Sequence, residues 1–126
     1  GWYILMDYFT EDELKCSHTG ECKMDDSFMY KINTIRKVCD FPFTVTSAYR
    51  HPTHPIEAKK AKAGSHASGR AIDIAVRGDK AHKLIEVALA YGITGIGVAQ
   101  KGSSRFIHLD DLDKASGYSR PTVWSY

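Results

Sequence analysis

The stretch Gly64–Ile74 holds two residues that commonly bind metal ions, His66 and Asp73, seven positions apart. A third, His108, lies in the stretch Phe106–Asp110. Two imidazoles and one carboxylate form a common ligand set for a catalytic zinc ion, with water in the fourth position. Each of these residues alone is more often an ordinary strand or surface residue. Together, the residue types suggest a metal site made of His66, Asp73 and His108.

Alternating sequence predicts that two of these residues lie on strands. Residues 70–76 alternate between apolar positions that would face a core and a second face that carries Asp73. Residues 105–110 alternate in the same way, so that His108 and Asp110 lie opposite the core-facing positions. If the two strands pair, Asp73 and His108 meet on the face that does not pack on the core.

The rest of the chain predicts the elements that must hold this pair of strands. In chain order they are a short helix capped by Thr10, a helix over about 28–39 capped by residues 25–27, a strand over 43–49, a helix from 78 to about 91 and a strand over 95–99. A turn at 101–104 would join the last strand to 105–110 as an antiparallel pair. This order predicts an α+β fold, a small mostly antiparallel sheet with helices packed on one face and the metal cleft on the open face.

Composition bounds the class of protein. A chain of 126 residues is expected to form one domain, 1–126. The hydrophobic content of 43% and the charged content of 25% are ordinary for a globular protein. The net charge of +2 is too small to argue for nucleic acid as a partner. No apolar run reaches the roughly 18 residues of a membrane span, and the short apolar start lacks the basic residues and length of a signal peptide.

Several motifs of the chain match one known family. The motif His66–x–x–Gly69–x–Ala71–x–Asp73–Ile74, followed by His108–x–Asp110, resembles the zinc D-Ala-D-Ala carboxypeptidase/hedgehog superfamily, and in particular its phage-type single-domain peptidoglycan peptidases. The segment Thr46–Ser47–Ala48–Tyr49–Arg50 is similar to the family's Ser-x-Tyr-Arg segment, and His54 follows at the familiar distance. The two ends of the chain, 9–16 and 120–126, also resemble such members. The resemblance therefore spans nearly the whole chain, with the central motif as its specific part.

The resemblance implies a hedgehog/DD-peptidase-like fold and one Zn²⁺ ion held by His66, Asp73 and His108. It implies hydrolysis of D,D or L,D peptide bonds in a peptidoglycan stem peptide, by a carboxypeptidase or endopeptidase such as a phage endolysin or virion-associated lysin. Such a protein is expected to be a monomer, made in the host cytoplasm and acting at the bacterial cell wall or periplasm. Arg50 is linked in the family to peptide recognition, and its planar fork suits a carboxylate. A surface salt bridge is the plainer interpretation of Arg50.

The sequence leaves the group that would transfer protons open. Many relatives carry Glu, Asp or His two or three residues before the last zinc histidine, where this chain has Phe106 and Arg105. Asp110, two residues after His108, is one candidate for the catalytic base. It is equally a candidate for orienting a metal ligand. His54 is the other catalytic candidate.

Three cysteines leave at least one thiol unpaired in a monomer. Cys16 and Cys22 flank a tight loop with His18, in which we expect free thiols or a disulfide rather than a second zinc site, because Cys39 is distant and no fourth ligand follows at the usual spacing.

Two functions from different classes remain. The first is a zinc peptidase acting on peptidoglycan, and the second is a hedgehog-like zinc-binding module without turnover that binds cell wall or a protein partner. The residues at 105 and 106 favour the second function, whereas Arg50 and Asp110 favour the first. A nuclease built on the same ligands is a distant third because the basic surface is thin.

Overall fold

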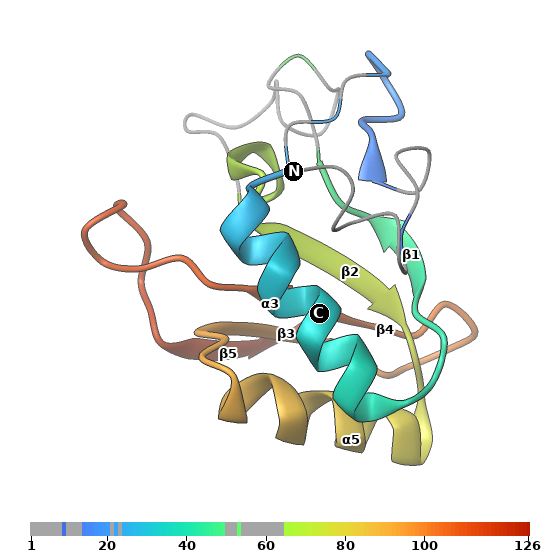
Figure 1. The fold of residues 1–126 in the computed structure, drawn as a ribbon. Coiled ribbons are helices and arrows are strands. Elements are labelled where there is room, and N and C mark those ends of the chain that lie inside the picture. The colour runs from blue at the N-terminus through green and yellow to red at the C-terminus, as the bar shows by residue number, and fades with distance from the viewer. Residues whose placement is uncertain (1–8, 10–13, 21, 23, 50–52, 54–64) are drawn as a thin grey trace.

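The described part of the chain contains two α-helices, one short 3-10 helix and one five-stranded sheet (Figure 1). The structure is a computed structural model, and it describes residues 9, 14–20, 22, 24–49, 53 and 65–126. The elements, in chain order, are α3 (Asp26–Cys39), β1 (Thr44–Ser47), the 3-10 turn η1 (Ser65–Ser68), β2 (Ala71–Ala75), α5 (Gly78–Ala90), β3 (Gly95–Ala99), β4 (Phe106–Asp110) and β5 (Thr122–Ser125). Helix α3 crosses in front of the sheet and α5 packs beside it, so the predicted α+β class is confirmed.

The sheet is mixed, which corrects the expectation of a mostly antiparallel sheet. The strand order is β1-β2-β4-β3-β5. The β1/β2, β2/β4 and β3/β4 pairs are antiparallel, including the predicted hairpin of β3 and β4. Strand β5, which the sequence did not predict, joins the outer side of β3 in parallel. The pairing is parallel because residues 111–121 return the chain from the end of β4 to the start of β3, where Thr122 of β5 pairs with Gly95.

Helix α3 forms as its sequence predicts. Asp25 caps it, because its Oδ1 accepts a hydrogen bond of 2.8 Å from the backbone N–H of Phe28. The predicted apolar stripe of Phe28, Ile32, Ile35 and Cys39 is buried against the sheet. The helix starts at Asp26 rather than near Phe28, since the residues after the cap already form its first turn.

The apolar core lies between the two helices and one face of the sheet. Its members from α3, α5 and the sheet include Phe28, Met29, Ile32, Ile35, Ala81, Leu84, Val87, Ala88, Ile72, Ile74, Ile96, Ile107 and Leu109. Burying each large side chain contributes about 1.5–3 kcal/mol. Because the helices cover one face, the other face of β2 and β4 is left to carry polar side chains.

Strands β2 and β4 pair as predicted, and Asp73 lies directly opposite His108. Ile72 and Ile74 point into the core, so Asp73 between them must point to the other face. The same alternation places His108 and Asp110 on that face. The pairing therefore brings together two residues that are 35 positions apart in sequence.

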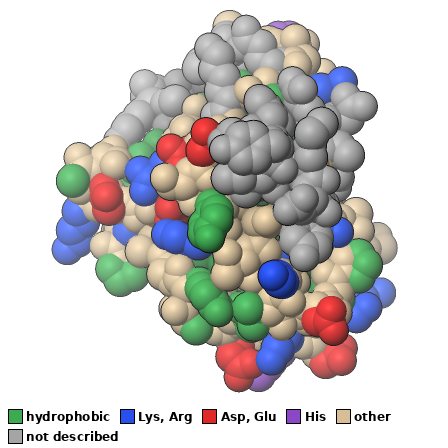
Figure 2. Space-filling view, in the orientation of Figure 1, with side chains coloured by type: hydrophobic (Ala, Val, Ile, Leu, Met, Phe, Trp, Pro, Cys, Tyr) green, Lys and Arg blue, Asp and Glu red, His purple; other side chains and the backbone are tan. Residues whose placement is uncertain are grey.

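Some expectations fall outside the described residues. These are the helix capped by Thr10, and the site residues Arg50 and His54. Cys16, Cys22 and Cys39 are all described, and no disulfide joins any two of them. Among the described helices, none combines the length and the apolar character that crossing a bilayer requires. On the face seen in Figure 2, basic and acidic side chains of the described residues are interspersed.

Candidate metal centre

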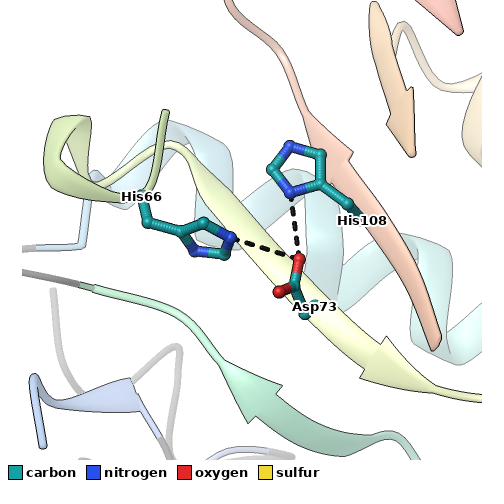
Figure 3. A group of neighbouring side chains, drawn as sticks. All are labelled: His66, Asp73 and His108. Carbon is teal, nitrogen blue, oxygen red and sulfur yellow. Dashed lines mark hydrogen bonds and ion pairs between the residues drawn. The ribbon is translucent and has the colours of Figure 1, made fainter. Parts of the chain in front are cut away.

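Three side chains from three elements converge on one point of the open face of the sheet (Figure 3). His66 comes from η1, Asp73 from β2 and His108 from β4. His108 Nδ1 lies 2.9 Å and His66 Nε2 lies 3.2 Å from the same oxygen, Asp73 Oδ1. One ligand atom from each residue lies within 4.8 Å of the others, and all three residues are buried.

The position of His66 is fixed by its second ring nitrogen. His66 Nδ1 lies 2.7 Å from the carbonyl oxygen of Ala48, just after β1. A carbonyl oxygen only accepts, so Nδ1 donates to Ala48, and Nε2 is the ring nitrogen that faces Asp73. Gly69 has a φ of +76° and allows the chain to turn from η1 into β2. The turn therefore places the histidine over the strand that carries its partner.

The position of His108 is fixed in the same manner by a carboxylate. His108 Nε2 lies 2.7 Å from Asp110 Oδ2. Arg120 donates to both oxygens of that carboxylate, from Nε to Oδ1 and from Nη2 to Oδ2, each at 2.8 Å. Asp110 is fully buried, so both its oxygens are occupied within the protein. The Nδ1 atom of His108 is thereby left for the centre.

The electrostatics follow from this arrangement. Burial raises the pKa of the Asp73 carboxyl, but hydrogen bonds from His108 and His66 outweigh burial and lower this pKa to about 2. Burial likewise raises the pKa of Asp110, and hydrogen bonds from Arg120 and His108 lower it to about 2. Burial lowers the pKa of His108, but its hydrogen bonds to Asp110 and Asp73 raise it above the ordinary value of 6.5. Both carboxylates are therefore ionised at neutral pH.

The donor set fits a zinc ion. Two imidazole nitrogens and one carboxylate oxygen face one another, and the second nitrogen of each imidazole is held by a hydrogen-bond acceptor. Ligating histidines characteristically donate their other ring N–H in this way, which sets the tautomer and the ring orientation. The residues His66, Asp73 and His108 could therefore hold one metal ion without rearrangement of their hydrogen bonds to the surrounding protein.

A cleft of about 300 Å³ opens at this centre. Besides the three polar residues, its described lining consists of Ser65, Phe106, Trp124 and Tyr126. The ring of Trp124 lies 5.0 Å from that of His108, and the rings of Phe106 and Tyr126 lie 5.1 Å apart, measured between centroids. One side of the cleft is therefore an aromatic wall made by Phe106 of β4, Trp124 of β5 and Tyr126, which directly follows β5.

The structure brings together His66, Asp73 and His108, the three residues that the sequence grouped. Asp110 lies next to them, but it contacts His108 and Arg120 rather than the cleft. The geometry thus favours the second of the two interpretations of Asp110, as a group that orients a ligand.

Sequence reasoning missed Arg120 and Trp124 as parts of the site. A signal for both was present in β3, where Gly95 and Gly97 interrupt an otherwise apolar strand. Glycine inside a strand often marks a close approach of another group. A Cβ atom at Gly97 would lie 2.6 Å from Trp124 Nε1, and one at Gly95 would lie 2.5 Å from Arg120 Nε.

Comparison with known proteins identifies the family. The sequence model of the family described as Peptidase M15 matches residues 7–110, which is most of the chain and includes all three residues of the candidate metal centre. No curated protein matches the chain significantly. The chain belongs to the peptidase M15 family, within the zinc D-Ala-D-Ala carboxypeptidase superfamily.

Proposed function

We propose that this member of the peptidase M15 family is a zinc-dependent hydrolase that cuts peptide bonds in bacterial peptidoglycan. The bond would be of the D,D or L,D type, and the biological setting a phage endolysin or virion-associated lysin that acts at the cell wall. The observation that carries the proposal is the convergence of His66, Asp73 and His108 on one point, with both imidazoles oriented by other hydrogen bonds.

In this proposal His66, Asp73 and His108 would hold one zinc ion through the ligand atoms that face one another, His66 Nε2, Asp73 Oδ1 and His108 Nδ1. A zinc ion bound there would polarise the peptide carbonyl and lower the pKa of a water molecule toward about 7. The chain's own contribution is to present three ligand atoms in fixed directions at the end of a cleft that is partly apolar. Because the ligands are preoriented, little reorganisation is needed when the ion binds.

The aromatic wall supports a substrate with an apolar part beside the scissile bond. Phe106 and Tyr126 stand together at the cleft, and Tyr126 is 62% exposed, so its ring is available to a bound molecule. An alanine side chain of a stem peptide could pack on these rings. Arg50, which lies outside the described residues, remains our proposed partner for a substrate carboxylate.

Proton transfer must come from another group than Asp110 in this proposal. Both oxygens of Asp110 are engaged and the residue is fully buried, so it is not within reach of a molecule in the cleft. Apart from Asp73, the described lining of the cleft contains no carboxylate. His54, also outside the described residues, is the remaining catalytic candidate from the sequence, with a group of the substrate as the other source.

The described lining of the cleft also favours the alternative function, a zinc-binding module without turnover. A zinc-binding module without turnover needs the three ligands but no general base, and none is present in the described lining besides the ligands themselves. Such a module would bind cell wall or a protein partner through the same cleft.

The test is zinc content combined with digestion of purified peptidoglycan, with products read by mass spectrometry. We expect about one zinc per chain and new peptide fragments. The variant His66→Ala should lose both zinc and fragments. His82→Ala, which changes an exposed histidine on α5, is the matched control and should keep both. Zinc without fragments across several wall types would favour the binding module, and a wild-type protein without zinc would refute the metal centre.

A further inference from the structure

The C-terminal segment of the chain lies outside the family match, which ends at Asp110, yet it contacts the candidate metal centre. We propose that Arg120 is a positioning residue of this centre. Its hydrogen bonds to both oxygens of Asp110 fix that carboxylate, and the carboxylate in turn orients the ring of His108 so that Nδ1 faces the metal site. This inference rests on the proposed metal centre and adds to it a residue beyond the ligands.

The Arg120 side chain contacts two residues, Asp110 and Trp124, that both contact the ring of His108. Its Nε and Nη2 donate to the two oxygens of Asp110, and Asp110 Oδ2 in turn accepts from His108 Nε2. Its guanidinium carbon also lies 5.0 Å from the ring centroid of Trp124, which packs on the ring of His108. The guanidinium therefore reaches the same imidazole by two routes, one through a carboxylate and one through an aromatic ring.

The type of residue fits this role. A guanidinium offers two parallel N–H groups that match both oxygens of a carboxylate, so it fixes the rotation of the carboxylate plane as well as its charge. The Arg120 side chain is only 10% exposed and the Asp110 side chain is 0% exposed, so solvent does not compete for the pair. A lysine at this position would keep the charge but would not fix the plane.

Strand β3 leaves space for this pair. Gly95 lies opposite Asp110, and a Cβ atom there would collide with the Asp110 carboxylate and would lie 2.5 Å from Arg120 Nε. The pair can form only because the side chain at position 95 is a hydrogen atom. Glycine at position 95 of β3 thus leaves the space in which Arg120 reaches Asp110 on the neighbouring strand β4.

Stability alone is a weak reason for such a pair. Replacing a buried ion pair by apolar residues is often neutral or stabilising, because both charges must be removed from water. Orientation of a metal ligand, by contrast, requires the hydrogen-bonding atoms themselves. Removal of a group that orients a ligand typically lowers metal affinity by about 10- to 100-fold.

The experiment is a zinc competition titration of metal-free protein against a chromophoric chelator, for the wild type, Arg120→Met and Arg120→Lys. We expect zinc affinity to fall about 10- to 100-fold in Arg120→Met and by less in Arg120→Lys. The matched control is Arg77→Met, which changes an exposed arginine before α5 and should stay within about twofold of the wild type. The visible spectrum of the Co²⁺-loaded protein should shift in Arg120→Met, because the geometry of the ligands changes.

A double-mutant cycle tests the route through Asp110. In an Asp110→Asn background, Arg120→Met should have little further effect on zinc affinity, because the two residues act as one unit. If Arg120→Met does not fold, as judged by circular dichroism, Arg120→Lys takes its place in the cycle, because lysine keeps the positive charge beside Asp110.

The outcomes separate this inference from the proposed function. If the wild type binds zinc but folded Arg120→Met has the same affinity and the same Co²⁺ spectrum, the role of Arg120 is refuted and the metal centre stands. If the effects of Arg120→Met and Asp110→Asn simply add, the route through Asp110 is wrong. A wild type that binds no zinc overturns the metal centre, and the inference with it.

Discussion

Gly97 is the position where a single methyl group should disturb the site most directly. It lies opposite His108 in β4 and opposite Trp124 in β5. In Gly97→Ala the new Cβ would lie 2.6 Å from Trp124 Nε1 and 3.0 Å from His108 Cβ, whereas ordinary contacts begin at 3.4 Å. The indole must therefore withdraw by about 0.8 Å, the difference between 3.4 and 2.6 Å. It cannot do so freely, because its strand is hydrogen-bonded to β3 in this register.

The expected size of the effect follows from two opposing terms. Overpacking of this kind costs about 1–3 kcal/mol. Replacing glycine in a strand returns about 0.5–1 kcal/mol, since alanine loses less conformational freedom on folding. With the middle of each range, about 2 kcal/mol lost and about 0.75 kcal/mol regained, the net loss in the free energy of unfolding is about 1 kcal/mol, or a fall in Tm of a few degrees for a chain of this length. Zinc affinity should fall as well, because Trp124 no longer packs on the ring of His108.

The assay is thermal unfolding of metal-free protein by circular dichroism, for the wild type, Gly97→Ala, Trp124→Ala and the double variant. With Trp124 truncated, the methyl group has space, and Gly97→Ala should be neutral or slightly stabilising in that background. If Gly97→Ala is as stable as the wild type, or if its cost is the same with and without the indole, the packing argument is refuted.

Three further predictions concern the same centre. Because the folded-state pKa of Asp110 is about 2 against an ordinary 3.8, its contribution of about 2 kcal/mol is present above pH 4 and is lost as the pH falls through 2. Acid unfolding of metal-free protein should show this loss, and Asp110→Asn should remove that part of the pH dependence. His108→Ala should abolish zinc binding, as measured by metal content after dialysis, and stoichiometric zinc in that variant would reject His108 as a ligand. Tyr126→Ala should raise KM for peptide substrate with a smaller change in kcat, and an unchanged KM in steady-state kinetics would exclude its ring from the substrate site.

The central part of the site was predictable because its signals are local. Period-two alternation in β2 and β4 decides which side chains face the core, and a strand pairing then has few registers that keep the apolar residues buried. That pattern places Asp73 and His108 on the same open face, and the family resemblance of the motif that contains His66 and Asp73 then pointed to a zinc site. To predict the position of His66, a turn at Gly69 must be predicted as well. The glycine itself indicated that turn.

The C-terminal part was not predictable from local signals. Strand β5 has only four residues and no fully buried position, and Val123 and Trp124 are its only apolar residues. Its partner β3 lies more than twenty positions earlier, and a parallel pairing at that distance depends on the whole fold. The contact of Arg120 with Asp110 depends on the same return of the chain. Only the glycines of β3 indicated that another group must approach.

The charges of the centre explain why two buried carboxylates can coexist on one face of the sheet. Among the described residues, Asp73 and Asp110 bring two negative charges, and Arg120 compensates for one of them. The remaining negative charge lies between two imidazoles, which can balance it with a proton. Such a proton on His108 is favoured by its contacts with both carboxylates, as its raised pKa shows. A divalent cation between His66, Asp73 and His108 would displace that proton, neutralise the same negative charge and add one positive charge to the centre. Its binding would use hydrogen-bond geometry that the metal-free protein already maintains.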